Sequence, residues 1–354
     1  MLRRTAGWLA NRETLPGSAR AVVGYYADTG VFDYRSVTLK RRVDSTVEQM
    51  IARAFTDIEE ALAEEFGYGY VRFEYDTKLV LPAKLTLGYL YRHMDDSEHH
   101  RAEQLTQLAI EALLDGDMRD ARNDEEFQDF EVDFDIDEHD RKLVAEIAQE
   151  VLQARVEEKL GEYPDSVRET YDWAVEISEA HQEQDEQFRQ LMADAQRGDE
   201  EALARIESEY RDAEFDDPPA LFTDDELALP YLKTQYDRVG VIYDAMVEMY
   251  RDVDLPVERS FQRAIVLAII GAQIWLDDVD DYEDDMREGQ LTPVTAEYLL
   301  ADDPTTAKAA VVDVSERYLD RAKAEAASAD STLTGIATEY ILRDGTPESL
   351  PGEE

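Results

Sequence analysis

AIVLAIIGAQIWLDDVDDYEDDMREGQLTP, residues 264–293, is the stretch that decides the expected fold. Its first thirteen residues carry no charge, and the aspartates Asp277, Asp278, Asp281 and Asp285 follow at once. Aspartates spaced three or four apart lie on one face of a helix. We therefore expect a buried apolar helix, running over 256–283, that carries several carboxylates at its inner end. Such oxygen ligands suit Mg²⁺, which usually also keeps waters and substrate phosphates in its coordination shell.

The whole chain is strongly acidic, with 83 Asp and Glu against 36 Lys and Arg and a net charge of -47 in 354 residues. Because 44% of the residues are hydrophobic, there is enough apolar material to bury a core. The acids are spread along the chain, which is typical of proteins adapted to high salt. We expect a cytoplasmic, halophilic protein. No basic stripe is present, so we expect no nucleic-acid partner.

Other features narrow the class of protein further. The sequence has no cysteine, which excludes disulfides and thiolate metal sites. No apolar stretch reaches the length that a transmembrane helix needs. The basic start MLRRTAGWLANRE has no long apolar core, so we expect no secretory signal. Peripheral contact of this segment with a membrane stays open, and so does a homodimer.

Apolar residues recur every three or four positions along most of the chain, which predicts an all-α, multi-helix bundle. Thr46–Glu65 shows a clear single apolar stripe, and helices are also expected at 293–300 and 304–328. Only 71–75 and 21–26 have the composition of strands. We divide one helical domain into 1–45 (N-terminal segment), 46–117 (first helical part), 118–138 (acidic insert or loop), 139–213 (long amphipathic helices), 214–230 (proline-rich linker), 231–330 (C-terminal helical part) and 331–354 (C-terminal region with a polar tail).

The residues around the aspartates form a recognisable pattern. Gln273 precedes them, Gly289 follows Asp285, and Lys233 and Thr234 open a helix upstream. This arrangement resembles the C-terminal half of trans-prenyl diphosphate synthases. The stretch that ends at Pro293 also resembles the second aspartate motif of squalene and phytoene synthases. Both groups have the class I isoprenoid (terpenoid) synthase fold, and the resemblance covers about residues 230–300.

The resemblance implies a second acidic motif on a facing helix. The candidate is GYLYRHMDDSEHHR, residues 88–101, in which Asp95 and Asp96 follow Tyr91 and Arg92. It is similar to the first aspartate motif of these families. It departs from the pattern at His99, where the motif would end in aspartate.

If the resemblance extends to activity, it implies a Mg²⁺-dependent prenyltransferase or terpenoid synthase that acts on an isoprenoid (allylic) diphosphate. The metal would be held by Asp277, Asp278, Asp281, Asp285, Asp95 and Asp96. The diphosphate would accept hydrogen bonds from Lys233, Arg92 and Arg101. The substrate would contact Tyr91, Leu90, Gln273 and Thr234.

Two other interpretations stay open. Aspartate is so frequent here that a DDxxD match arises easily by chance. The protein would then be non-catalytic, either a degenerate member of that fold or an interaction module whose aspartates serve solubility in salt. The second alternative is a transition-metal site at His93, His99 and His100, although the Glu-x-x-His spacing of di-iron bundles is absent.

Overall fold

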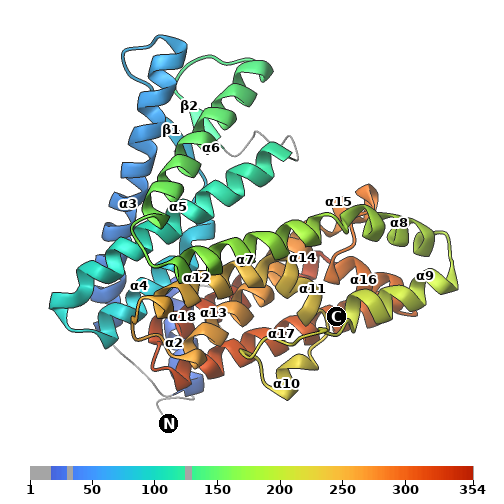
Figure 1. Ribbon diagram of the computed structural model, residues 1–354. Coiled ribbons are helices and arrows are strands. Elements are labelled where there is room, and N and C mark those ends of the chain that lie inside the picture. The colour runs from blue at the N-terminus through green and yellow to red at the C-terminus, as the bar shows by residue number, and fades with distance from the viewer. Residues whose placement is uncertain (1–16, 30–34, 124–129, 354) are drawn as a thin grey trace. The chain divides into compact units, whose positions relative to one another are not determined.

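The computed structural model describes residues 17–29, 35–123 and 130–353 (Figure 1). Most of these residues are helical and very few are in strands, which confirms the all-α prediction. The chain forms two compact units, where one domain was expected. Unit 1 comprises the described residues of Met1–Asp33, Asp172–Ala245 and Val257–Glu354, and unit 2 comprises those of Tyr34–Tyr171 and Met246–Pro256.

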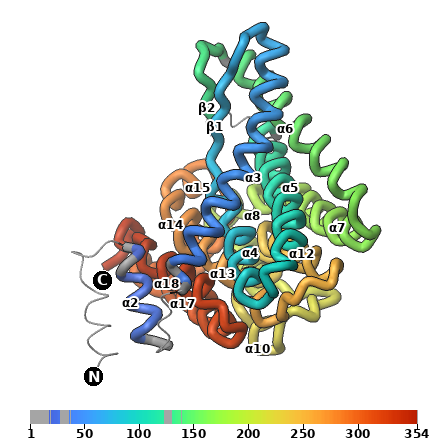
Figure 2. The backbone as a smooth tube through the Cα atoms, turned by 90° about the vertical axis from the view of Figure 1, so that its left-hand side faces the viewer, coloured from blue at the N-terminus to red at the C-terminus, as the bar shows by residue number. Residues whose placement is uncertain are grey.

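Unit 2 is a group of long helices with one small ribbon of strands (Figure 2). The apolar stripe predicted within Thr46–Glu65 is confirmed, because Val47, Ala54, Ile58 and Leu62 are all buried. The elements of unit 2 are α3 (Arg35–Phe66), β1 (Phe73–Tyr75), η1 (Lys78–Val80), α4 (Leu81–His93), η2 (Asp96–Glu98), α5 (His99–Asn123), β2 (Phe130–Val132) and α6 (Glu138–Leu160).

The segment 118–138 was expected to be an acidic insert or loop, but parts of it form a helix and a strand in the structure. Helix α5 continues to Asn123, with Met118 buried, and β2 begins at Phe130. β2 pairs antiparallel with β1, so that Phe73 lies opposite Val132. Phe73 also meets Phe55 of α3 edge to face, with ring centroids 5.2 Å apart. Phe130, one of the phenylalanines that interrupt the acidic stretch, thus belongs to a packed ribbon, and 124–129 lie outside the described residues.

Unit 1 contains the apolar helix and its aspartates. α13 packs along α17, and α18 packs against α17 and α2 (Figure 1). The chain passes between the units within α7 (Asp165–Gln182) and α12 (Val241–Asp252). The other elements of unit 1 are α2 (Gly17–Thr29), α8 (Asp185–Gln196), α9 (Glu200–Arg205), η3 (Ile206–Arg211), α10 (Asp224–Leu227), α11 (Leu232–Gln235), η4 (Tyr236–Gly240), α13 (Arg259–Ala272), η5 (Gln273–Asp277), α14 (Asp278–Asp280), α15 (Tyr282–Glu288), α16 (Pro293–Leu300), α17 (Pro304–Ser328), α18 (Thr332–Asp344) and η6 (Pro347–Ser349).

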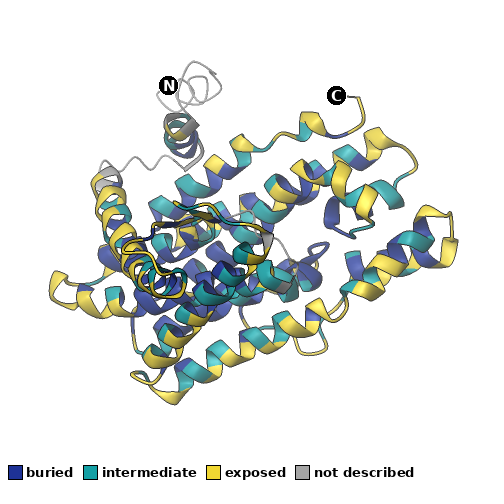
Figure 3. Cartoon of the chain, turned by 90° about the horizontal axis from the view of Figure 1, so that it is seen from above, coloured by how far each residue is buried: buried dark blue, intermediate teal, exposed yellow. Residues whose placement is uncertain are grey.

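Figure 3 shows that most helices carry buried residues on one side and exposed residues on the other. The strand expected at 21–26 is wrong, because this segment lies within α2. Ala21 and Tyr25, four residues apart, are buried on one face of that helix. No helix among the described residues is long and apolar enough to cross a membrane. The start MLRRTAGWLANRE, considered for membrane contact, lies outside the described residues.

Replacing a helical glycine with alanine is expected to have opposite effects on stability at two positions. A Cβ at Gly335 of α18 would lie 2.2 Å from the Tyr25 ring, whereas one at Gly116 of α5 would meet nothing within 4 Å. We expect Gly335→Ala to lower the free energy of unfolding by about 1–3 kcal/mol through overpacking. Gly116→Ala, the matched control, should raise it by about 0.5–1 kcal/mol through helix propensity. Urea unfolding measures both, and a stable Gly335→Ala variant would contradict the close packing of α2 on α18.

Candidate functional site

The aspartates of unit 1 do not lie on the single continuous helix over 256–283 that was expected. α13 ends at Ala272 and passes through the π-helical turn η5, in which the Asp278 N–H donates to the Gln273 carbonyl, five residues back. A second irregularity at Asp281 separates α14 from α15. Gly289, with φ 76°, ends α15 in the left-handed region, where glycine has no Cβ penalty. π-helical turns of this kind often occur at functional sites.

Asp278 is the most deeply buried of these aspartates, with a side chain 2% exposed. Its Oδ1 accepts from Arg238 Nη1 and from Gln273 Nε2, both at 3.4 Å. Its Oδ2 has no hydrogen-bond partner among the described residues. A buried carboxylate oxygen without a donor costs free energy, so this atom is a specific place for a positively charged ligand.

The neighbouring aspartates share the same excess of negative charge. Burial, followed by repulsion from Asp278 and Asp281, raises the pKa of Asp285 to about 7. Loss of hydration and then repulsion from the same two carboxylates raise the pKa of Asp277 to about 6. Asp281 is exposed; a partial loss of hydration, and then repulsion from Asp280 and Asp284, raise its pKa. Clustered carboxylates behave in this way when no cation compensates them.

Arg238 of unit 1 lies near the aspartates, and both Arg238 and Lys233 act on His181. Arg238 comes from the π-helical turn η4 and faces Asp278. Burial alone would lower the pKa of its guanidinium, but Asp278, Tyr210, Asp185 and Asp285 together outweigh burial and raise it. Lys233 is held by Asp237, four residues later, at 2.6 Å. Arg238 is therefore the counter-ion of the cluster.

The remaining predicted substrate residue of unit 1 is Thr234. It is buried, and its hydroxyl donates to the carbonyls of Tyr210 and Tyr231. The hydrogen bond to Tyr210 links α11 to η3. Gln273, by contrast, reaches Asp278 directly, as described above.

Helix α8 lies against the acidic end of this region. Arg189 Nη2 donates to Gln290 Oε1 at 3.3 Å, and Gln196 Nε2 donates to the Met286 carbonyl at 3.0 Å. Asp185 begins α8 and lies close enough to Arg238 to raise its pKa. Neither Arg238 nor Asp185 was among the predicted site residues. In a chain with 83 acids, no sequence signal distinguishes Asp185 from its neighbours.

The predicted first motif belongs to unit 2, so the structure does not bring it into one compact unit with Asp277 to Asp285. Asp95 is exposed, and Asp96 is 91% exposed, 3.7 Å from Arg42 and 3.4 Å from His99. Arg101 donates to the Val253 carbonyl at 2.7 Å. The other members are Leu90, buried in the core, Tyr91, whose hydroxyl donates to Glu103 at 2.5 Å, and Arg92, which is exposed.

The described residues form no ready-made metal centre. Among the described residues, no three or more His, Asp or Glu side chains are placed to hold a metal ion together. His93 Nδ1 lies 2.8 Å from the Tyr89 carbonyl, and His99 is buried beside Arg42 at 3.0 Å. The carboxylates of Asp277 to Asp285 would therefore have to change rotamer to converge on a cation.

His181 of α7 predicts a dependence of stability on pH. Burial, and then the positive charges of Arg238 and Lys233, lower its pKa to about 4. In the unfolded chain the value is about 6.5, so below that pH the unfolded state binds the proton first. We expect protonation of His181 in the unfolded chain to lower the free energy of unfolding by about 2 kcal/mol as the pH falls from 7 to 5.

Urea unfolding at both pH values measures this loss as the difference between the parent chain and His181→Gln. The comparison with the variant cancels the opposite contribution of Asp277 and Asp285, whose raised pKa values favour the folded state as pH falls. His139→Gln, at an exposed position, is the matched control and should keep the parent behaviour. Equal pH dependence in His181→Gln and the parent would refute the assignment.

No protein-family model, curated protein or solved structure matches the chain. The functional interpretation therefore depends on the residues of the site themselves.

Proposed function

We propose that the protein is a Mg²⁺-dependent enzyme acting on an isoprenoid diphosphate, and that unit 1 has the class I isoprenoid synthase fold. The observation that carries the proposal is the buried Asp278 carboxylate, whose Oδ2 has no partner among the residues described. Repulsion from Asp278 and Asp281 raises the pKa values of Asp277 and Asp285, and Arg238 offsets only part of this effect. A divalent cation would satisfy that oxygen and remove the repulsion.

The residues of unit 1 have distinct roles in this proposal. Asp277, Asp278, Asp281 and Asp285 would hold Mg²⁺, which when bound supplies positive charge to the diphosphate leaving group. Arg238 lies 3.4 Å from Asp278, which is long for a charge-assisted hydrogen bond. Its guanidinium is therefore available to a phosphate oxygen, and Lys233 lies close by.

The reaction would begin at the allylic C–O bond. That bond breaks, its electron pair leaves with the diphosphate, and an allylic cation remains. Arg238 and Lys233 would donate to the diphosphate oxygens as negative charge gathers there. The proposal takes its metal ligands from unit 1. The second acidic motif that the resemblance implies, with Asp95, Asp96, Arg92 and Arg101, belongs to unit 2, and its part in the reaction stays a prediction.

The test uses the full chain in molar KCl with MgCl₂ and either farnesyl or geranylgeranyl diphosphate. We expect Mg²⁺-dependent release of inorganic diphosphate, reduced about 100-fold or more in Asp278→Asn. Mg²⁺ should also raise the melting temperature of the parent chain but not of this variant.

Asp284→Asn is the matched control, because Asp284 lies on the same stretch, is 64% exposed and pairs with Arg287 at 2.6 Å. This variant should retain both the Mg²⁺-dependent release of inorganic diphosphate and the rise in melting temperature with Mg²⁺. If neither diphosphate is hydrolysed or converted, the enzyme assignment is wrong. If Mg²⁺ also leaves the melting temperature unchanged, the aspartates only solvate the protein in salt.

A further inference from the structure

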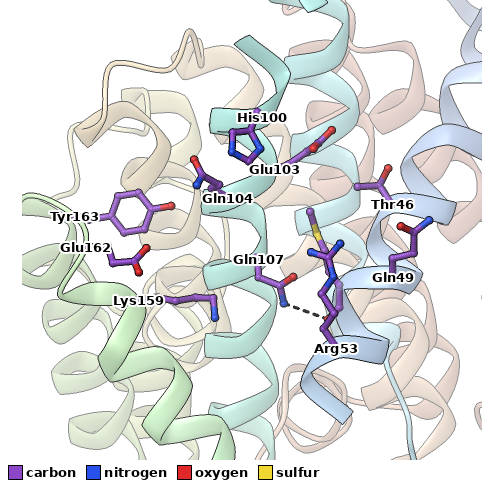
Figure 4. A pocket seen from close by; sticks show the side chains of 11 residues that line it. Thr46, Gln49, Arg53, His100, Glu103, Gln104, Gln107, Lys159, Glu162 and Tyr163 are labelled. Atoms are coloured by element: carbon purple, nitrogen blue, oxygen red, sulfur yellow. Dashed lines mark hydrogen bonds between the residues drawn. The ribbon is translucent and has the colours of Figure 1, made fainter. Parts of the chain in front are cut away.

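Unit 2 contains a pocket that is separate in sequence and composition from the candidate site of unit 1. It lies between α3, α5 and the end of α6 and has a volume of about 460 Å³, within the range of small-molecule sites. Figure 4 shows Arg53 of α3, Glu103 and Gln107 of α5, and Lys159 of α6 around this space. Basic and amide side chains thus gather here although the chain as a whole is acidic.

Two residues that line the pocket, Gln107 and Lys159, belong to a network of charged side chains next to it. Glu111 of α5 is fully buried, and its Oε1 accepts from Gln107 at 2.6 Å and from Arg155 at 2.5 Å. Its Oε2 lies 2.9 Å from the Lys159 ammonium. Arg155 is also paired with Asp57. Two cations and two carboxylates cancel, so this network positions Gln107 and Lys159 without adding net charge.

Arg53 and Glu103 take no part in that network of ion pairs. Arg53 has no hydrogen bond or ion pair to any residue that the structure describes. Its planar guanidinium offers paired donors that match a carboxylate. Glu103 accepts from the Tyr91 hydroxyl through Oε1 at 2.5 Å, and its second oxygen has no partner within the described part of the chain. The pocket therefore presents the exposed guanidinium of Arg53 and one oxygen of the half-buried Glu103, both without a partner among the described residues.

We propose that this pocket binds a small zwitterion of the α-amino-acid class. The ligand carboxylate pairs with Arg53, and the ligand ammonium donates to Glu103. A simple anion would meet repulsion from Glu103 and from Glu162, which also lines the pocket. A simple cation would leave Arg53 unpaired. Gln104, at the exposed side of the lining, is positioned for a polar ligand side chain.

The test uses the full chain with ¹³C-methyl-labelled methionine, because Met50 lines the pocket. Its resonance is assigned with Met50→Leu, and L-alanine, L-serine and L-glutamine are titrated separately in molar KCl. We expect a saturable shift of the Met50 methyl with at least one of them. Binding should weaken at least tenfold in Arg53→Gln and in Glu103→Gln. Propionate, propylamine and inorganic phosphate are titrated in parallel as single-charge probes.

Arg72→Gln is the matched control, since Arg72 is an exposed arginine of unit 2 that pairs with Glu74 at 2.6 Å. It should bind like the parent. The proposal is overturned if none of the three amino acids shifts Met50, or if Arg53→Gln binds them equally well. It is also overturned if propionate or phosphate binds more tightly than the amino acids, because the pocket would then select anions.

Discussion

Replacing Arg238 with methionine is expected to lower the free energy of unfolding by about 3 kcal/mol. Arg238 is 31% exposed, but its partner Asp278 is 2% exposed, and Gln273 is its only other donor within the described part of the chain. Removing the guanidinium leaves a buried carboxylate among three others that already repel it. Urea unfolding in molar KCl with EDTA measures the loss without interference from divalent cations.

A double-mutant cycle separates this effect from lost packing. Arg238→Met combined with Asp278→Asn should be much more stable than Arg238→Met alone, because the uncompensated charge is gone. Arg287→Met is the matched control; Arg287 is 65% exposed and pairs with Asp284, so it should stay within about 0.5 kcal/mol of the parent. If Arg238→Met is equally harmless, Arg238 does not compensate Asp278.

Replacing Glu111 with alanine is expected to cost about 3–5 kcal/mol. The carboxylate is fully buried, accepts a hydrogen bond from Gln107 and forms ion pairs with Arg155 and Lys159. Its removal leaves the Lys159 ammonium without its buried partner and opens a cavity between α5 and α6. Glu111→Gln keeps the side-chain volume, and its free energy of unfolding should lie between those of Glu111→Ala and the parent. Urea unfolding followed by circular dichroism gives the three free energies.

Glu158→Ala is the matched control, because Glu158 is an exposed glutamate beside Lys159 on the same helix. It should change stability by no more than about 0.5 kcal/mol. Loss of stability only in the glutamine variant, or in neither variant, would mean that the buried network does not stabilise unit 2.

The sequence predicted best those helices whose ends are marked by local chemistry. α16 and α17 begin and end at the expected residues, since a capping residue followed by proline starts each of them. Asp303, for example, accepts from the N–H groups of Thr305 and Thr306. By contrast, α18 was not predicted, and α2 was mistaken for a strand because its β-branched and aromatic residues favour helix only through packing on α18.

The candidate site was predictable only in part. The aspartates stood out because an apolar helix precedes them. Gln273 donates to Asp278 in the structure, and its expected contact with a substrate stays a prediction. The π-helical turns η4 and η5 were not predictable, because a periodicity of 3.6 residues does not reveal one inserted residue. Those turns bring Arg238 to Asp278, and that contact joins residues 40 positions apart. The role expected for Asp95 and Asp96 in metal binding stays a prediction.

The interleaving of the two units determines when each can fold during synthesis. Unit 2 is complete once the ribosome has passed Pro256, whereas unit 1 needs α18, close to the C-terminus, to cover α2 near the N-terminus. Domains generally fold as units while the chain emerges. The early α2 segment must therefore wait, with Tyr25 uncovered, until almost the whole chain has been made. A nascent chain halted before Thr332 would hold a folded unit 2 beside an incomplete unit 1.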